Sequence, residues 1–123
     1  RSVLLMADIT DSTDFGIFFK LRMISLKSST WNFLQDAIWD VVNHKDGTGK
    51  LARIEGVDIY GKTGTAQNPH GEAHSWFAGY MTIDNDPVIS LSVLVEHGGK
   101  GSIEGAIISR KIFEFIVQNE FIQ

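Results

Sequence analysis

Two stretches of the chain carry apolar residues at the three-to-four-residue spacing of an amphipathic helix. The first stretch follows the polar residues 28–30, which are N-cap candidates, and ends before a glycine-containing loop at 46–49. The second follows Ser102, another N-cap candidate, with Glu104 in the first turn, where the helix dipole favours a negative charge. The apolar faces predicted to meet the core are Trp31, Leu34, Ile38 and Val41 in the first helix and Ile108, Ile112, Phe115 and Ile116 in the second.

Three stretches between these helices have the patterns of β-strands. Residues 57–67 and 74–83 are rich in β-branched and aromatic side chains, and from Ile89 to Val95 apolar and polar residues alternate. A turn sequence at 84–87 separates the last two strands, and so short a connection favours an antiparallel hairpin. The chain is therefore predicted to have an α+β fold, in which an antiparallel sheet of three C-terminal strands is flanked by helices.

The first 27 residues have a weaker pattern. Residues 3–6 predict a short strand, residues 11–14 a turn and residues 15–25 a second strand. These elements do not by themselves indicate a function.

Composition narrows the class of protein. With 43% hydrophobic and 21% charged residues the chain can fill a core, and a net charge of −4 without any basic run argues against a nucleic-acid partner. The absence of cysteine excludes disulfides, thiolate catalysis and cysteine metal sites. No apolar run approaches the roughly 20 residues that span a bilayer. We therefore expect any membrane anchor to lie in an N-terminal segment outside this sequence.

The chemistry of the chain is concentrated in residues 61–67, Gly-Lys-Thr-Gly-Thr-Ala-Gln. Lys62 supplies a cation and Thr63 a hydroxyl, while Gly64 lacks a Cβ and lets another backbone approach the strand closely. An extended acyl substrate could pair along this strand with its carboxylate near Lys62 and Thr63. A lone Lys-Thr-Gly also recurs by accident on solvated edge strands, so its surroundings decide its meaning.

Those surroundings resemble class B penicillin-binding proteins. Residues 57–71 resemble the third strand of their active site, residues 74–80 the strand that follows it, and residues 95–115 their last strand and C-terminal helix. Thr48-Gly49 before Ala52-Arg53-Ile54 matches the loop that precedes the third strand, and Asn-Pro-His-Gly at 68–71 favours the elongation-specific subgroup. The resemblance covers residues 28–117, with residues 1–27 as a poorly defined lead-in. It identifies the whole chain, 1–123, as the C-terminal portion of a transpeptidase domain with the penicillin-binding/serine β-lactamase-like fold.

The resemblance implies serine acyl transfer on peptidoglycan stem peptides ending in D-Ala-D-Ala, at the periplasmic face of the bacterial inner membrane. It implies β-lactam binding at the same site and no cofactor. By the same likeness, Lys62 would shape the potential beside the nucleophile and the Thr65 N–H would be an oxyanion-hole donor. The substrate contacts implied are Thr63, Gly64, Gln67 and Trp76.

Two motifs of that family are absent from this sequence. None of the seven lysines has a serine three residues before it, and neither Ser-x-Asn nor Tyr-x-Asn occurs. We therefore expect the chain to be inactive alone, to pair with the remainder of a transpeptidase domain, and to self-associate through apolar surface left uncovered. The alternatives are a class D β-lactamase or β-lactam sensor domain, and a binding domain without catalysis.

One further cluster could hold a metal ion. His70, Glu72 and His74 alternate along the chain, so on a strand they would share one face and offer the ligand types of a zinc site. The spacing is not that of His-Glu-x-x-His, and the cluster falls between two strands of the resembled active site. We favour a structural or substrate-rim role and expect no metal.

Overall fold

The computed structural model describes the backbone of residues 2–9 and 19–119, and the chain folds as two units, residues 1–34 and 35–123. In the first unit, β1 (Ser2–Ile9) pairs antiparallel with β2 (Phe19–Leu26). Both N-terminal strand predictions are confirmed where the structure describes them. The predicted turn at 11–14 and the start of the second predicted strand lie outside the described residues.

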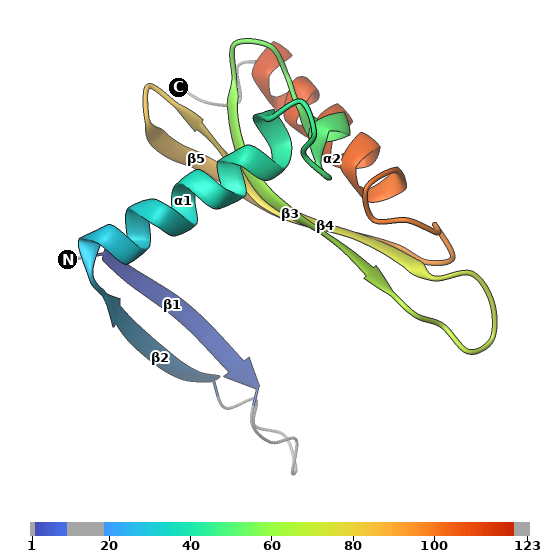
Figure 1. Cartoon of the computed structure of the whole chain (residues 1–123), viewed down its shortest axis with the longest axis horizontal. Helices are drawn as coiled ribbons and strands as arrows, with labels where there is room; N and C mark the ends of the chain where they lie inside the picture. Colours follow the sequence, from blue (N-terminus) through green and yellow to red (C-terminus); the bar gives the residue numbers. More distant parts are fainter. Residues whose placement is uncertain (1, 10–18, 120–123) are drawn as a thin grey trace. The chain divides into compact units, whose positions relative to one another are not determined.

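The second unit is built on one antiparallel sheet of three strands in the order β3-β4-β5. These strands are β3 (Asp58–Ala66), β4 (His74–Ile83) and β5 (Asp86–Val95), as Figure 1 shows. The predicted hairpin is confirmed, but its turn is shorter than expected. Asp84 and Asn85 both have positive φ, 52° and 68°, which is the geometry of a two-residue hairpin loop. Asp86 therefore already begins β5.

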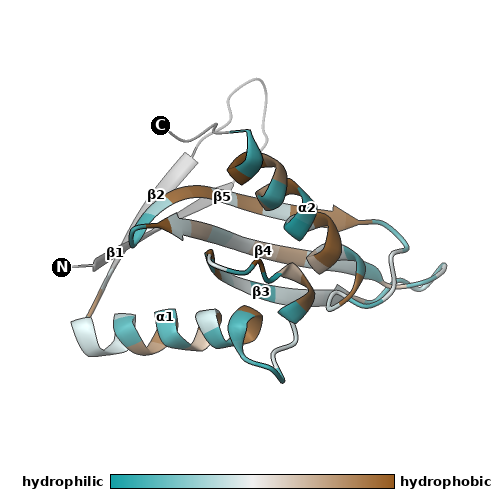
Figure 2. Cartoon of the chain, turned by 90° about the horizontal axis from the view of Figure 1, so that it is seen from above, coloured by the Kyte–Doolittle hydropathy of each residue, from teal (hydrophilic) through white to brown (hydrophobic). Residues whose placement is uncertain are grey.

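One face of this sheet is covered by α2 (Glu104–Gln118), as Figure 2 shows, and the short helix η1 (Lys50–Ala52) packs against α2. Strand residues two apart point to the same face, so Ile59 on β3 and Phe77 and Met81 on β4 all turn toward this helix. The predicted α+β architecture is confirmed. The fully buried apolar residues that form the core are Val42, Ala52, Ile59, Phe77, Met81, Ala106 and Phe113.

The buried face of α2 differs from the predicted one. Ile112 and Phe115, which were expected to meet the core, are 39% and 57% exposed. The helix instead buries Gly105, Ala106, Ser109 and Phe113 against the sheet. Small side chains bring the helix backbone close to β4: a Cβ added at Gly105 would lie 3.0 Å from the carbonyl carbon of Trp76. The pattern of large apolar residues therefore predicted the packed face only in part: Ile116 packs against the core, whereas Ile112 and Phe115 form an exposed outer stripe.

The start of α2 also departs from the prediction. The N-cap position is Ile103 rather than Ser102, and the apolar side chain of Ile103 makes no capping hydrogen bond. The hydroxyl of Ser75, on β4, accepts a hydrogen bond from the Gly105 N–H over 2.8 Å instead. The cap is thus supplied by another element. Glu104 lies in the first turn as predicted.

The predicted first helix is α1 (Ser28–Asn43), which begins at the polar triplet rather than after it. Leu34, expected to be buried, is 42% exposed, and Val42 is the residue of this helix that is fully buried. The last turn docks on the start of β3. Asn43 Nδ2 donates to the Ile59 carbonyl over 2.7 Å and also to the carbonyl of Trp39 over 2.9 Å. No helix among the described residues is long and apolar enough to cross a membrane.

Candidate active site

The outer edge of β3 presents a row of backbone groups. β3 is an edge strand, and the carbonyls of Ile59 and Thr63 accept hydrogen bonds from Asn43 Nδ2 and Lys62 Nζ, each over 2.7 Å. Both carbonyls therefore point away from β4. In an antiparallel strand the N–H and C=O of one residue point to the same side, and the sides alternate with period two. By this alternation the Thr65 N–H also faces the free edge.

The two polar side chains of the Lys-Thr-Gly stretch flank this edge from opposite faces of the sheet. Lys62 is exposed on the face away from α2, directly opposite Ala78 of β4. Thr63 lies on the α2 face, half-buried, and its hydroxyl donates to the hydroxyl of Thr48 over 3.1 Å. A group lying along the edge of β3 would therefore have the Lys62 ammonium on one side and the Thr63 hydroxyl on the other.

The remaining predicted contact residues surround the end of the strand. Trp76 is 39% exposed and lies opposite Gly64, where an added Cβ would come within 3.3 Å of the Trp76 Cβ. Gln67 is exposed and follows the last residue of β3. Trp76, on the central strand β4, lies on the same face of the sheet as Lys62.

The close backbone approach expected at Gly64 occurs within the chain. A Cβ added at Gly101 would overlap the Gly64 carbonyl oxygen and lie 2.6 Å from its carbonyl carbon. The Gly101 N–H also donates to Thr65 Oγ1 over 3.1 Å. Residues just before α2 therefore lie directly on the α2 face of the Gly64–Thr65 peptide.

Residues 20–117 match the family described as the penicillin binding protein transpeptidase domain. The chain belongs to this family. The match begins within β2 and ends within α2, so it includes the whole three-stranded sheet and the residues around its free edge. It confirms the resemblance read from residues 57–71.

Individual relatives agree with this assignment. The peptidoglycan D,D-transpeptidase MrdA of Haemophilus influenzae is 29% identical over 79% of this chain and 17% of its own length. The D,D-transpeptidase domain of a peptidoglycan glycosyltransferase from Eggerthella lenta matches 89% of this chain and 25% of that one, with 27% identity and a TM-score of 0.66. Penicillin-binding protein A from M. tuberculosis, solved as an imipenem acyl-enzyme complex, matches 81% and 22%, with 26% identity and a TM-score of 0.60. The chain thus spans between 17% and 25% of the length of these relatives.

Three residues of this transpeptidase segment were not predicted as part of the site. Thr48 meets Thr63, Gly101 meets the Gly64–Thr65 peptide, and Ser75 bonds to the residues on either side of the Gly101 turn. The sequence match of Thr48-Gly49 to the family loop pointed to the first of them. The sequence around Gly101 and Ser75 contains no pattern that marks them as site residues, because each contacts a partner far along the chain.

Of the predicted cluster His70, Glu72 and His74, it is His74 that contacts the loop after β5. His74 Nδ1 accepts a hydrogen bond from the backbone N–H of His97 over 3.0 Å, and the two rings meet edge to face at 5.2 Å. Asn68 Nδ2 lies 3.3 Å from His97 Nδ1, and the Gly99 N–H donates to the Ala73 carbonyl over 2.8 Å. In the described ranges 2–9 and 19–119, no three His, Cys, Asp or Glu side chains are arranged to hold a metal ion. These contacts join the start of β4 to the loop after β5.

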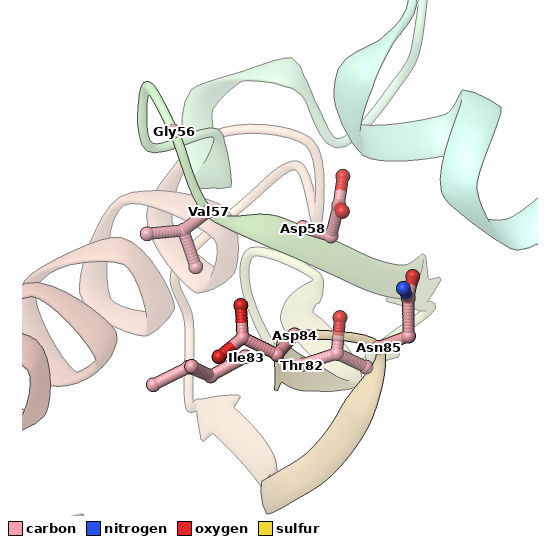
Figure 3. A pocket seen from close by; sticks show the side chains of 7 residues that line it. All are labelled: Gly56, Val57, Asp58, Thr82, Ile83, Asp84 and Asn85. Carbon is pink, nitrogen blue, oxygen red and sulfur yellow. The ribbon is translucent and has the colours of Figure 1, made fainter.

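A pocket of about 340 Å³ lies at the other end of β3, between the start of that strand and the β4–β5 hairpin (Figure 3). The hydroxyl of Thr82 is buried there without a hydrogen-bond partner among the described residues. The Asp58 carboxylate accepts from the Trp39 indole over 2.9 Å and points away from Asp84. The acidic groups of this pocket do not converge, so it does not form a second charged site.

Proposed function

We propose that this chain supplies one wall of a peptidoglycan D,D-transpeptidase active site, opposite a serine carried by polypeptide outside the chain. The observation that carries the proposal is the free edge of β3. The Lys62 ammonium, the Thr63 hydroxyl and the Thr65 N–H all lie along this edge, within reach of a peptide that adds to it. An extended peptide can add to such an edge through its backbone, because the edge offers unpaired N–H and C=O groups. Membership of the transpeptidase family supports this choice of substrate class.

The proposed reaction is acyl transfer in two steps. The serine oxygen attacks the carbonyl of the penultimate D-alanine, the peptide bond breaks, and terminal D-alanine leaves with the proton as its free amine. The amine of a second stem peptide then attacks the ester, forms the cross-link and returns the proton to the serine. Each tetrahedral intermediate carries a negative oxygen, for which the Thr65 N–H is one donor.

The other residues of the edge have separate roles in catalysis and in substrate binding. Lys62 holds a positive potential at the site, which favours the deprotonated form of the attacking hydroxyl and the negative intermediate. Thr63 binds the terminal carboxylate, and Gly64, Gln67 and Trp76 contact the peptide. β-Lactams carry an equivalent carboxylate and acylate the same serine. The imipenem acyl-enzyme of the M. tuberculosis relative supports this extension.

The proposal extends to the setting of the enzyme. We place the catalytic domain at the periplasmic face of the inner membrane, where its peptidoglycan substrate lies. The partner of the chain is the remainder of the transpeptidase domain, and residues 1–123 form its C-terminal portion. Since no Ser-x-x-Lys occurs in the chain, it is inactive by itself.

Labelling with a fluorescent penicillin tests the proposal. The purified 123-residue chain should remain unlabelled, whereas the complete polypeptide that contains it should carry a stable label on one serine. A heat-unfolded sample of the complete polypeptide is the control for nonspecific reaction. Labelling of the isolated chain, or no labelling of the folded complete polypeptide, would contradict the proposal. A label that is rapidly lost by hydrolysis would instead identify a β-lactamase.

A further inference from the structure

The Gly64–Thr65 peptide is held from the α2 side by a backbone rather than by a side chain. The Cα of Gly101 lies so close to this peptide that a Cβ there would overlap the Gly64 oxygen. The Gly101 N–H donates to Thr65 Oγ1 over 3.1 Å, so the contact is fixed by a hydrogen bond as well as by packing. Because a peptide unit is planar, its C=O and N–H move together. Anything that shifts Gly101 therefore shifts the Thr65 N–H at the free edge.

Gly101 is in turn held in place by Ser75. The Ser75 hydroxyl is fully buried; it donates to the Lys100 carbonyl over 3.1 Å and accepts from the Gly105 N–H over 2.8 Å. One side chain on β4 thus fixes the residue immediately before Gly101 and the first turn of α2. Its loss would leave the buried Gly105 N–H and the Lys100 carbonyl without this partner, and an unsatisfied buried N–H carries a desolvation penalty, which favours a shift of the turn.

We infer that Ser75 and Gly101 are positioning residues for the oxyanion-hole N–H of Thr65. The inference rests on the proposed function and adds to it a chain of contacts that runs from β4 through the turn before α2 to the catalytic edge. Neither residue belongs to the edge strand itself: Ser75 lies on β4, and Gly101 lies on the α2 face of the Gly64–Thr65 peptide. Their effect is on the limiting rate of acylation, because a displacement of about 1 Å at a reacting group can cost about 10²-fold in rate.

The test uses the complete polypeptide and measures two constants for acylation by a fluorescent penicillin: the noncovalent Kd and the limiting rate. The variants are Ser75→Ala and Gly101→Ala, with Ser109→Ala as the matched control. Ser109 is also a fully buried serine, but its hydroxyl donates to the Gly105 carbonyl over 2.7 Å, a hydrogen bond that stays within α2. Thermal unfolding of each variant reports how much stability it has lost.

We expect Ser75→Ala and Gly101→Ala to lower the limiting rate by about tenfold to a hundredfold, with a much smaller change in Kd. Ser109→Ala should acylate at a rate close to the wild type even where it unfolds at a similarly lowered temperature. Equal rates for all three variants at equal folded fraction would overturn the inference and leave the proposed function standing. A wild-type polypeptide that is not acylated would overturn both. If Gly101→Ala does not fold, Ser75→Ala alone decides between these outcomes.

Discussion

The phenol ring of Tyr60 lies parallel to that of Tyr80, with the ring centroids 4.8 Å apart and the planes within 1° of each other. The two residues are directly opposite one another on β3 and β4, on the face of the sheet that α2 does not cover. Burial raises the pKa of Tyr60 above its ordinary value, and the nearby Asp58 carboxylate adds to this effect. Ionisation of the Tyr60 phenol therefore opposes folding.

This arrangement predicts a specific loss of stability in alkali. The folded state holds the Tyr60 proton more tightly than the unfolded chain, in which the pKa is 10.0. The contribution of the Tyr60 proton to the free energy of unfolding is therefore fully present below pH 10.0 and is lost as the pH rises through the raised pKa of the folded state. Tyr60→Phe has no such proton, so its stability should fall less steeply above pH 10.0 than that of the wild type.

Urea denaturation at a series of pH values measures this difference. Ser90→Ala, an exposed substitution opposite Tyr80 on β5, is the control and should follow the wild-type curve. If Tyr60→Phe and the wild type lose stability in parallel above pH 10.0, the raised pKa is refuted.

Replacing Lys62 should separate catalysis from folding. Its side chain is exposed and bonds to the neighbouring Thr63 carbonyl, so Lys62→Ala should change the free energy of unfolding by less than about 0.5 kcal/mol. In the complete polypeptide the same change should lower the rate of penicillin acylation by about 10²–10³, as for the loss of an electrostatic group in an oxyanion site. Lys111→Ala, an exposed lysine on α2, is the control. Equal acylation by both variants would exclude a role for Lys62.

Two phenylalanines on α2 test which face of this helix packs on the sheet. Phe113 is fully buried and Phe115 is 57% exposed. Phe113→Ala should destabilise the chain by about 3–5 kcal/mol, because it leaves a cavity in the core. Phe115→Ala should cost less than about 0.5 kcal/mol. Urea denaturation decides between them, and Phe113→Leu serves if the alanine variant is unfolded. A larger loss at Phe115 would show that the packing of α2 described above is wrong.

The outer stripe of α2 also predicts self-association of the isolated chain. Ile112 and Phe115 are exposed on this helix, and apolar groups gathered on a surface favour contact with another molecule. Sedimentation velocity should show species larger than a monomer that increase with concentration. Phe115→Glu should reduce them, whereas Gln118→Glu, an exposed position with the same change in charge, should not. A wild-type chain that remains monomeric at all concentrations would refute the prediction.

Local patterns in the sequence predicted the elements better than their packing. Alternation from Ile89 to Val95 and the turn residues after Ile83 were sufficient to predict a hairpin, because strand pairing across a short loop is decided by neighbouring residues. The buried face of α2 was predicted only in part, since most of the residues that it buries fully, Gly105, Ala106 and Ser109, are small. Gly105 and Ser109 are buried because β4 lies close to this part of α2, and the spacing of apolar residues along the sequence does not show that closeness.

The same distinction holds for the candidate site. Lys62 to Gln67 could be proposed as site residues because they are contiguous in the sequence. The residues that support them were missed because Gly101 and Thr65 are 36 positions apart, and Ser75 and Gly105 are 30 positions apart. Ser102 was chosen as the helix cap on its residue type and its place in the chain, and the tertiary partner Ser75 took that role instead. A hydrogen bond between distant residues depends on how the elements meet, and a single sequence does not contain that information.

The way β3 is anchored limits the insertions and deletions that this protein can tolerate. Asn43 holds the carbonyl of Ile59 on the outer side of the strand, and the outward direction of the Thr65 N–H follows only because Thr65 is an even number of positions further along the strand. One residue gained or lost between them would turn the Thr65 N–H toward β4 while leaving composition and charge almost unchanged. In natural variation, length changes should therefore collect in the loops on either side of β3 and be absent from the strand itself.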